Sequence, residues 1–396
     1  MTVKLFHEDV YLTECYSQIV DIHDHDDDQF IILDQTIFSP RAGGQPGDQG
    51  TIGGCDVKRV IEKDGVIYHQ VASIPATKQV HCQIDWAHRL DMMQNHCGEH
   101  ILSGIFFSEY GAANKGFHMS SDTVTMDIDI QNIDHEIIER VENLANTAVY
   151  NNYPIHTTFL DSKDEADKHS LRKSLNVSED IKIVTIENTD CIACCGTHPS
   201  YTGEVGIIKI TKYEKYKGMT RIYFKCGQRA LRDYQFKHEI ATELYRMHSG
   251  NSSNIIEKIK KEEEKNKSIR KELTDYKNSI SKLEAEKIGM FEKDFIMLRY
   301  QDYGTDVLQN IIKRTLNNSS KILVLVSDSH HAVVLAHNMS SSDIQFGQLV
   351  KKYAINLGGK GGGSNTSAQV GFNDKASMDA FCDIIVGVLS NSNPNI

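Results

Sequence analysis

The segment 238–298 differs in composition from the rest of the chain. Its apolar residues recur at alternating steps of four and three, interrupted by Glu262 and Asn266, at Ile255, Ile259, Ile269, Leu273, Tyr276, Ile280 and Leu283. Glutamate and lysine fill most of the remaining positions. A heptad seam of this kind is typical of an antiparallel helical hairpin or a coiled coil. The segment is therefore expected to be a helical linker, and its seam is a candidate surface for a homodimer, as is the C-terminal domain.

The segments on either side of this linker have their own patterns. Residues 1–88 are β-rich, with short strand-like runs separated by turn residues,. Residues 89–237 mix helical and strand-like patterns, which favours an α+β layer,. Residues 299–396 combine buried-type strands with helices and predict a compact α/β domain,. The predicted fold class is therefore α+β and multidomain.

Composition excludes several classes of protein. Hydrophobic residues make up 40% of the chain and charged residues 24%, as in ordinary globular proteins,. The sequence contains no apolar run of the roughly 18 residues that a membrane helix needs, and the first ten residues lack the pattern of a secretory signal,. The expected location is therefore the cytoplasm, with no membrane partner. Nine cysteines are an odd number and are expected to be thiols, and the tight cluster at 191–195 indicates metal binding,.

Two pairs of residues have the spacing of metal ligands. His96 and His100 lie four apart in a helical pattern, so both imidazoles project from one face,. Cys194 and His198 are also four apart, in a turn-like segment with a glycine between them,. Three imidazoles and one thiolate form a mixed tetrahedral set that suits Zn²⁺. Two other thiols, those of Cys191 and Cys195, are alternatives to Cys194, and the zinc is either catalytic or purely structural.

A glycine-rich segment, residues 38–50, follows a strand-like run. Gly43 and Gly44 let backbone amides approach a ligand closely,. Gln45 and Thr36 add polar groups suited to a small hydroxyl or amino group. The segment predicts a substrate-binding loop, and the alternative is an ordinary tight loop between strands.

Basic residues gather in one part of this acidic chain, whose formal net charge is −11. Between Lys209 and Lys237 there are nine basic residues against two acidic ones. This excess predicts a surface that follows a phosphate backbone, and the alternative is a solvated face. The candidate phosphate contacts are Arg221, Lys225, Arg229 and Arg232.

A second glycine-rich segment lies near the C-terminus. Five glycines, which leave the backbone amides accessible, surround one lysine in the order Gly358, Gly359, Lys360, Gly361, Gly362 and Gly363. Predicted secondary structure resumes on both sides, which favours a phosphate-contacting loop over a flexible linker. The segment lacks the ending of a nucleoside-triphosphate loop, so it does not imply ATP binding.

Taken in chain order, these segments resemble the freestanding alanyl-tRNA editing proteins of the long type, which are relatives of the editing and C-terminal domains of alanyl-tRNA synthetase. SPRAGGQPGDQG (39–50) is similar to the glycine motif of the family's N-terminal barrel. NHCGEHILS (95–103) and CCGTHPSYTGEVG (194–206) resemble its HxxxH helix and CxxxH turn. LGGKGGGSNTSAQVGF (357–372) resembles the DHHA1 nucleic-acid-binding domain, with SNT where the family often has Arg-Pro-Asp.

The resemblance implies a fold, a cofactor and a reaction. Residues 1–88 would be a β-barrel, 89–237 a zinc-binding editing domain, and 299–396 a DHHA1-like tRNA-binding domain. One Zn²⁺ per chain would be held by His96, His100, Cys194 and His198. The implied activity is that of a deacylase acting in trans, which hydrolyses the ester of mischarged Ser-tRNA(Ala), with Gly-tRNA(Ala) as a second substrate. Thr36 would sense the serine hydroxyl.

The residues agree with this chemistry. An aminoacyl ester is already activated, so its hydrolysis needs chiefly a positioned water and discrimination between substrates. Glu99, next to His100, is the candidate general base, and an exposed helix carboxylate is the alternative,.

Three other classes of protein share some of these features. The main rival is a non-catalytic zinc-containing nucleic-acid-binding module. A phosphoesterase needs clustered aspartates and histidines for paired metals, and no Asp-His-His run occurs in the sequence,. The helix reads His-Cys-Gly-Glu-His, which is not the His-Glu-x-x-His of a metalloprotease,.

Overall fold

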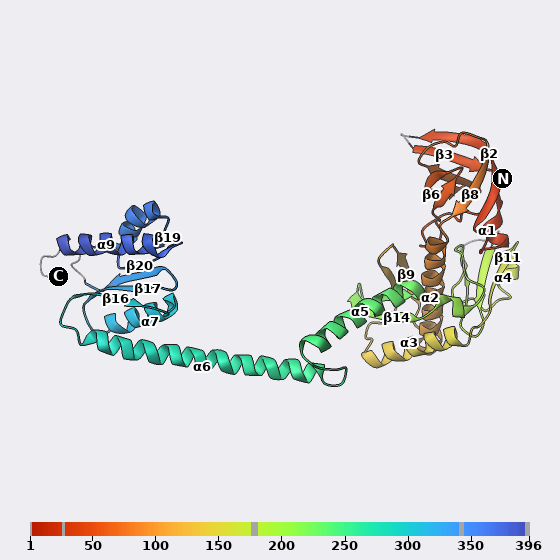
Figure 1. Cartoon of the computed structure of the whole chain (residues 1–396). Helices are drawn as coiled ribbons and strands as arrows, with labels where there is room; N and C mark the ends of the chain where they lie inside the picture. Colours follow the sequence, from red (N-terminus) through yellow and green to blue (C-terminus); the bar gives the residue numbers. More distant parts are fainter. Residues whose placement is uncertain (1, 26–27, 176–180, 340–343, 393–396) are drawn as a thin grey trace. The chain divides into compact units, whose positions relative to one another are not determined.

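A computed structural model describes residues 2–25, 28–175, 181–339 and 344–392 (Figure 1). The chain divides into two compact units, Met1–Glu243 and Leu244–Ile396. The division falls inside one helix, α5 (Gly227–Met247). The finer division at residues 88, 237 and 298 remains a prediction.

The first unit begins with a closed barrel of six strands, which confirms the barrel expected from the sequence. The strands pair in the order β2 (Glu14–His25), β3 (Asp28–Leu33), β7 (Val66–Val71), β6 (Cys55–Lys63), β5 (Gly50–Ile52) and β8 (Gln79–Ile84), and β8 closes on β2. Alternate side chains of β7 point inward, as a period of two requires, and Ile67, His69 and Val71 are buried,. The turn between β6 and β7 has positive φ at Asp64 and Gly65,.

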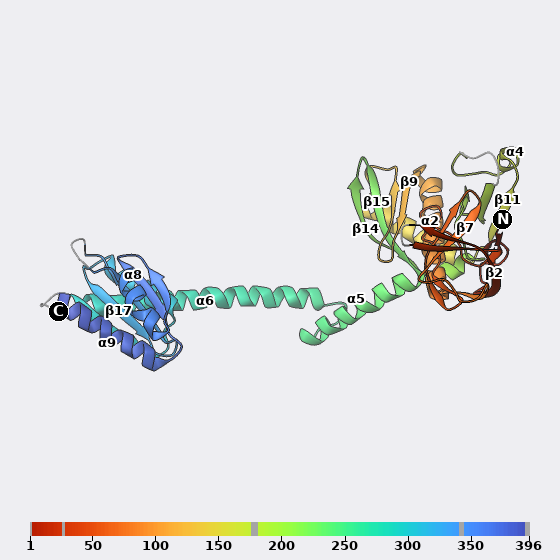
Figure 2. The same ribbon diagram turned by 90° about the horizontal axis from the view of Figure 1, so that it is seen from above.

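The rest of the first unit surrounds one long helix, α2 (Trp86–Tyr110) (Figures 1 and 2). Asp85 caps its start by accepting a hydrogen bond from the His88 backbone, and Gly111 ends it in the left-handed conformation,. Nearly every residue from Met92 to Phe106 is buried, so the polar residues on this stretch are buried as well,. The helix is therefore the central element of the core and presents polar groups inside it.

Two antiparallel sheets and a second helix, α3 (His135–Tyr150), complete this part of the unit. The four-stranded sheet has the order β14 (Ile208–Tyr216), β15 (Met219–Cys226), β10 (Val124–Ile128) and β9 (Asn114–Met119). The three-stranded sheet has the order β11 (Ile155–Leu160), β12 (Ile181–Ile186) and β13 (Asp190–Ala193). Apolar residues of α2, α3 and both sheets form a single core cluster.

A buried ion pair joins α2 to the barrel. Arg89, on the first turns of α2, is fully buried, and its Nε donates to Asp48 Oδ1 at 2.7 Å. The same guanidinium donates to Asp48 Oδ2 and to the carbonyl of Ile37 at 2.6 Å. Asp48 in turn accepts the backbone N–H of Ser39 at 2.5 Å. The pair therefore fixes the glycine-rich segment, which lies between Ser39 and Asp48, against the helix that carries His96 and His100.

The second unit is a five-stranded sheet covered on both faces. Its order is β16 (Phe295–Tyr300), β17 (Ile322–Ser327), β18 (Ala332–His337), β20 (Ser367–Gly371) and β19 (Lys360–Gly363). Strands β17 and β18 are buried along their whole length, which explains their unbroken apolar sequences,. One face packs with α7 (Thr305–Leu316) and the end of α6 (Ile255–Gly289). The other packs with α8 (Phe346–Leu349), the irregular turns of residues 350–357 and α9 (Lys375–Ser392).

The heptad seam lies entirely on α6, so it does not fold back on itself. Near the end of the helix Ser281, Ala285 and Ile288 are buried, and α6 packs against α7 there. Farther from that end, Ile269, Leu273 and Tyr276 are exposed. Pairing of this face with a second chain remains a prediction. No helix among the described residues combines the length and apolarity that a membrane crossing requires.

The Arg89–Asp48 pair gives a prediction about stability. We expect Asp48→Ala to destabilise the first unit by about 3–5 kcal/mol, because it leaves the buried Arg89 charge without a counterion. Asp129→Ala is the matched control, since it removes a half-exposed carboxylate that pairs with Lys115 at 3.3 Å, and it should cost at most about 1 kcal/mol,. Urea unfolding followed by the fluorescence of Trp86, the only tryptophan, reports on this unit. Equal shifts in the two variants would contradict the anchoring role.

Candidate active site

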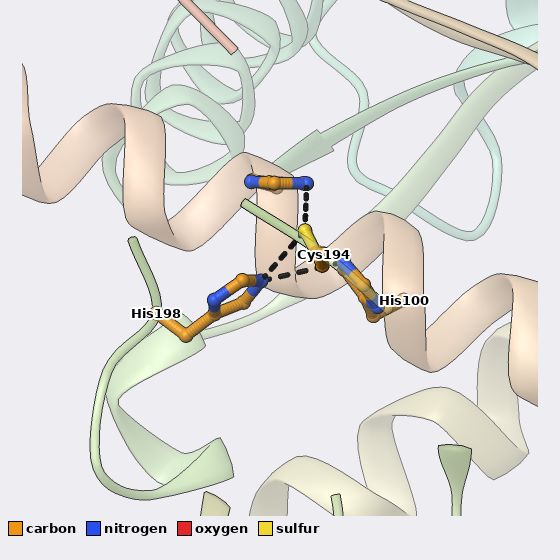
Figure 3. A group of neighbouring side chains, drawn as sticks. His100, Cys194 and His198 are labelled. Atoms are coloured by element: carbon orange, nitrogen blue, oxygen red, sulfur yellow. Dashed lines mark hydrogen bonds between the residues drawn. The ribbon is translucent and has the colours of Figure 1, made fainter. Parts of the chain in front are cut away.

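The four predicted metal ligands converge in the first unit. His96 and His100 project from one face of α2, and Cys194 and His198 belong to the segment that follows β13. Figure 3 shows His100, Cys194 and His198 pointing toward one another. Cys194 Sγ lies 3.4 Å from His96 Nε2 and 3.7 Å from His198 Nε2, and the Nε2 atoms of His198 and His100 are 3.3 Å apart. One donor atom from each residue lies within 4.8 Å of all the others. Such a cluster has the composition and compactness to hold one metal ion.

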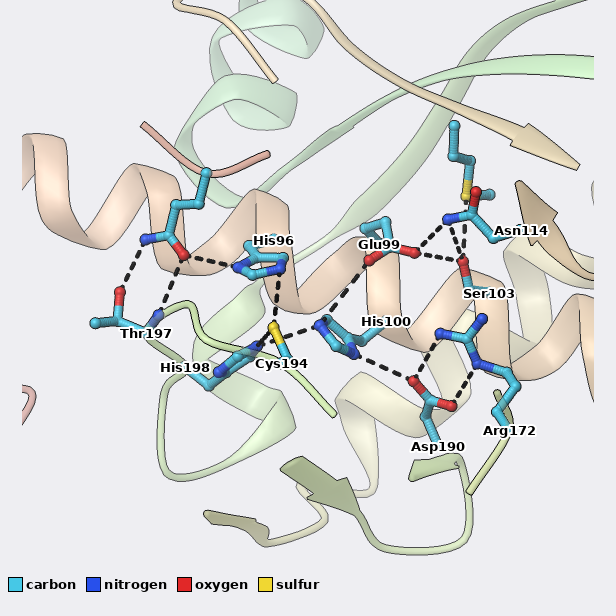
Figure 4. Close-up of polar contacts among 12 residues, drawn as sticks. His96, Glu99, His100, Ser103, Asn114, Arg172, Asp190, Cys194, Thr197 and His198 are labelled. Carbon is cyan, nitrogen blue, oxygen red and sulfur yellow. Dashed lines mark hydrogen bonds and ion pairs between the residues drawn. The ribbon is translucent and has the colours of Figure 1, made fainter. Parts of the chain in front are cut away.

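Hydrogen bonds fix the orientation of two of the rings (Figure 4). His96 Nδ1 lies 2.7 Å from Gln45 Oε1, and His100 Nδ1 lies 3.2 Å from Asp190 Oδ2. Both partners are acceptors, so each Nδ1 donates to them and each Nε2 points into the cluster. Burial tends to lower the pKa of His100, but the Cys194 thiolate and Asp190 outweigh it and raise that pKa well above its ordinary value, so binding of a metal at His100 Nε2 would displace a proton,. Oxygen acceptors behind histidine ligands are a usual feature of metal sites.

Asp190 is itself held in place by Arg172. The guanidinium donates from Nε to Asp190 Oδ1 at 2.7 Å and from Nη2 to Oδ2 at 3.1 Å. Burial tends to raise the pKa of the Asp190 carboxyl, but hydrogen bonds from His100 and Arg172 outweigh it and lower that pKa,. The carboxylate therefore stays ionised and orients His100.

The protonation states of the other two ligands also suit a metal. Burial lowers the pKa of His198 to about 3, so its imidazole is neutral,. Burial acts to raise the pKa of the Cys194 thiol, but the three nearby imidazoles outweigh it and lower that pKa well below the ordinary value,. His198 Nδ1 is buried and has no hydrogen-bond partner among the described residues.

The turn that carries Cys194 and His198 requires its glycine. A side-chain carbon at Gly196 would lie 2.3 Å from His96 Cε1 and 2.4 Å from Gln45 Oε1. The backbone there therefore approaches the cluster more closely than any other residue type allows. Gln45 holds the next residue, since its Nε2 donates to Thr197 Oγ1 at 2.8 Å and its Oε1 accepts from Thr197 N at 3.1 Å.

A cavity of about 520 Å³ opens onto the cluster. The glycine loop contributes Gly43 and Gly44 to its wall, and α2 contributes His96, Glu99 and His100. Strand β9 supplies further lining residues, Asn114 to Phe117, and the Phe117 ring stacks on His96 at 5.5 Å between centroids. The predicted glycine loop and the predicted metal ligands thus share one cavity.

Glu99 is buried beside this cluster and is not an exposed helix carboxylate. Its Oε1 accepts hydrogen bonds from Ser103 Oγ at 2.5 Å and from Asn114 Nδ2 at 2.6 Å (Figure 4). Its Oε2 lies 3.9 Å from His100 Nε2. One oxygen is thus held by two donors, and the other faces the cluster.

Thr36 does not lie in this cavity, contrary to the expectation. It ends the short strand β4 (Gln35–Thr36) and is fully buried in the barrel core. Its Oγ1 lies 2.8 Å from Nε2 of His69, whose Nδ1 lies 3.2 Å from the Ile31 carbonyl. Because that carbonyl only accepts, Nδ1 carries the proton and the Thr36 hydroxyl donates to Nε2. The hydroxyl is therefore used inside the barrel, whose inward-facing position sequence reasoning did not identify.

The basic segment 209–237 is partly neutralised by carboxylates. Arg229, a predicted tRNA contact, is buried and pairs with Asp91, so that expectation is wrong. Of the other predicted contacts, Arg221 donates twice to Asp127 and Lys225 pairs with Asp233. Lys209, Lys212 and Lys237 also have carboxylate partners, namely Glu142, Glu214 and Asp233. Most of the partners come from outside the segment, which is why counting charge along the sequence overstated the excess. Arg232 is exposed on α5 and stays a predicted contact.

The C-terminal glycine segment is mostly an edge strand and not a loop. Gly358 ends a short helical turn in the left-handed conformation, and Gly359 leads into β19. The residues from Lys360 to Gly363 are exposed along the edge of the second unit's sheet. A role in phosphate contact remains a prediction.

Several contributing residues were missed by sequence reasoning. Asp190, Arg172, Ser103 and Asn114 support the ligands and Glu99 from positions without a recognisable motif. Only Asp190 could have been suspected from the sequence, because it lies four residues before Cys194, the same spacing as in the two ligand pairs.

Comparisons with known proteins agree with this site. Residues 181–223 match the family model described as the threonyl and alanyl tRNA synthetase second additional domain, and residues 292–391 match the DHHA1 domain. The alanyl-tRNA editing protein AlaX-L of Pyrococcus horikoshii is 31% identical over 391 residues, which cover 93% of this chain and 94% of that protein. The alanine–tRNA ligases of Pyrococcus abyssi and Methanococcus maripaludis are 30% and 26% identical over 98% and 86% of this chain. The chain spans only 44% and 39% of those two ligases.

The buried ligand cluster and the two domains matched by family models define an aminoacyl-tRNA deacylase. The chain belongs to the alanyl-tRNA editing proteins, which confirms the resemblance noted in its sequence.

The geometry predicts which thiol binds the metal. Elemental analysis of the purified protein should find about one divalent metal ion per chain, and Cys194→Ala should lose it because one of four donor atoms is removed. Cys195→Ala is the matched control: its thiol is adjacent in sequence but exposed and outside the cluster. Loss of metal from the Cys195 variant with retention in the Cys194 variant would reverse the assignment.

Proposed function

We propose that this chain hydrolyses the ester bond of tRNA(Ala) mischarged with serine, acts on Gly-tRNA(Ala) as a second substrate, and does so in trans with one zinc ion. The observation that carries the proposal is the cluster of His96, His100, Cys194 and His198. The first three of these residues line one cavity together with Glu99 and the glycine loop. AlaX-L of Pyrococcus horikoshii, similar over most of its length, is named for alanyl-tRNA editing. A tRNA substrate supports a cytoplasmic location for this activity.

The donor set favours zinc among the divalent metals. Three imidazoles and one thiolate suit Zn²⁺ better than Mg²⁺ or Ca²⁺, which prefer oxygen ligands. The acceptors Gln45 and Asp190 fix the orientation of the His96 and His100 rings before any ion binds. When bound, zinc supplies a Lewis acid that polarises or orients a polar group of the substrate or water.

Glu99 is the proposed general base. Its Oε1 is engaged by Ser103 and Asn114, which leaves Oε2 free to accept a proton from a water molecule in the cavity. Because an aminoacyl ester is already activated, a positioned water and a held carboxylate are sufficient, and no covalent nucleophile is needed.

Selection of the amino acid is assigned to the cavity wall and not to a direct contact from Thr36. Gly43 and Gly44 bring bare backbone to the cavity, where amide groups meet a small substrate,. Gln45 links that loop to His96 and to Thr197. A polar wall of this kind favours a substrate with a hydroxyl, because an analogue that lacks it leaves polar groups unpaired.

The reaction gives a first test. The purified chain should release serine from Ser-tRNA(Ala) and leave Ala-tRNA(Ala) largely intact. Glu99→Gln should lower kcat by about 10²–10⁴, because it removes the proton acceptor while preserving shape and hydrogen bonding. Glu109→Gln, on the exposed end of the same helix, is the matched control and should retain activity. Absence of hydrolysis by the metal-loaded wild type, with tRNA binding intact, would support the non-catalytic module instead.

The barrel position of Thr36 gives a second test. Thr36→Val should reduce hydrolysis of Ser-tRNA(Ala) and Gly-tRNA(Ala) to the same extent, since it leaves buried His69 without its donor and costs about 1–3 kcal/mol of stability,. Rates on both substrates and unfolding monitored by Trp86 fluorescence are the measurements. A loss confined to the seryl substrate would instead make Thr36 the sensor of the serine hydroxyl.

A further inference from the structure

A second cavity, of about 620 Å³, adjoins the one that contains the ligand cluster. Lys182 and Cys195 line both. The glycine segment also borders both, with Pro40 and Ala42 on the second cavity and Gly43 on the first. The two cavities therefore share Lys182, Cys195 and one loop in their walls, and the function proposed above leaves the second one unused.

The second cavity has an aromatic wall. Phe159, near the end of β11, is 51% exposed, so one face of its ring is open to a ligand. The His7 ring, in the short helix α1 (Leu5–Glu8), lies 4.9 Å from the Phe159 ring between centroids, and the buried Phe6 ring lies 4.6 Å from His7. One exposed ring backed by two others forms a rigid surface on which a flat group can stack.

Cations and carboxylates surround this wall. Lys182 Nζ lies 6.0 Å from the Phe159 ring centroid and donates to the Gly196 carbonyl at 2.6 Å, so it connects the wall to the turn that carries the metal ligands. Lys4 lines the cavity and pairs with Glu62 at 2.6 Å, and Asp161 adds a second carboxylate. The cavity therefore offers cations to a phosphate and acceptors to an exocyclic amino group.

An aromatic platform flanked by cations is the arrangement by which proteins hold single-stranded nucleic acid. This inference rests on the proposed function. The esterified adenosine of a charged tRNA ends a single strand, so the nucleotide before it must leave the first cavity by an adjoining space. We infer that the second cavity binds the penultimate nucleotide of the aminoacyl-tRNA, with its base stacked on Phe159 and its phosphate near Lys182 and Lys4.

The test combines a change in the protein with a change in the tRNA, as in a double-mutant cycle. It therefore measures the coupling between Phe159 and the penultimate base. Two substrates are used: Ser-tRNA(Ala), and Ser-tRNA(Ala) with an abasic residue at the penultimate position. For the wild type, loss of the base should lower kcat/KM between about 5- and 150-fold, the factor expected for one base–aromatic stack. For Phe159→Ala, which has already lost the stack, the abasic penalty should fall to within about twofold.

Two further variants keep the result interpretable. Phe107→Ala removes a similarly exposed phenylalanine, 43% exposed on α2 and outside both cavities, and should show the full wild-type penalty. Phe159→Trp keeps an aromatic surface and should restore the penalty. Metal content and Trp86 fluorescence verify that each variant is folded.

The outcomes separate the two proposals. Equal abasic penalties in the wild type and Phe159→Ala, or no penalty in the wild type, would overturn the nucleotide site while leaving the deacylase intact. A wild type that does not hydrolyse unmodified Ser-tRNA(Ala) would overturn the proposed function itself.

Discussion

The buried ion pair between Arg89 and Asp48 is the interaction on which the arrangement of the site depends. The barrel contributes the glycine loop and α2 contributes two ligands, and neither alone forms the cavity. Arg89 fixes their relative position with hydrogen bonds to Asp48 and to the Ile37 carbonyl, all without contact with solvent. A charge taken out of water is tolerated only with such complete pairing, so the geometry of this junction is narrowly defined. From there Gln45 extends the junction to His96 and to the turn at Thr197.

Much of this structure could be predicted from local sequence patterns. The ligand set followed from spacing: residues four apart on a helix or in a turn share a face, and His96, His100, Cys194 and His198 do converge,. The strands of the barrel and of the C-terminal sheet followed from alternation and from apolar runs, because burial on one or both faces imposes those patterns. Glu99 was found through its neighbour His100, although its burial was not foreseen.

What the sequence did not predict depended on contacts between distant segments. Thr36 precedes the glycine loop, but the inward face of its strand directs its hydroxyl to His69, 33 residues away. Arg229 belongs to a basic run, but Asp91 on α2, 138 residues away, neutralises and buries it. Asp190 and Asn114 support the site only because the sheets fold around α2. The role of a charged group or a hydroxyl depends on its partner. A partner so distant in the sequence leaves no pattern in the neighbouring residues.

These pairings also bear on how an acidic chain would recognise nucleic acid. Six of the nine cations between Lys209 and Lys237 pair with five carboxylates, so the segment attracts a phosphate backbone at long range less than its sequence indicates,. Recognition by the first unit then depends more on directed short-range contacts, in places where a cation lies beside an aromatic ring. Lys182 is such a cation, since it contacts the metal-ligand turn through the Gly196 carbonyl and lies near the exposed Phe159 ring. Salt weakens stacking and hydrogen bonding much less than it weakens binding driven by counterion release. Contacts of this kind would therefore hold the reactive end of a tRNA even though the net negative charge of the chain repels it.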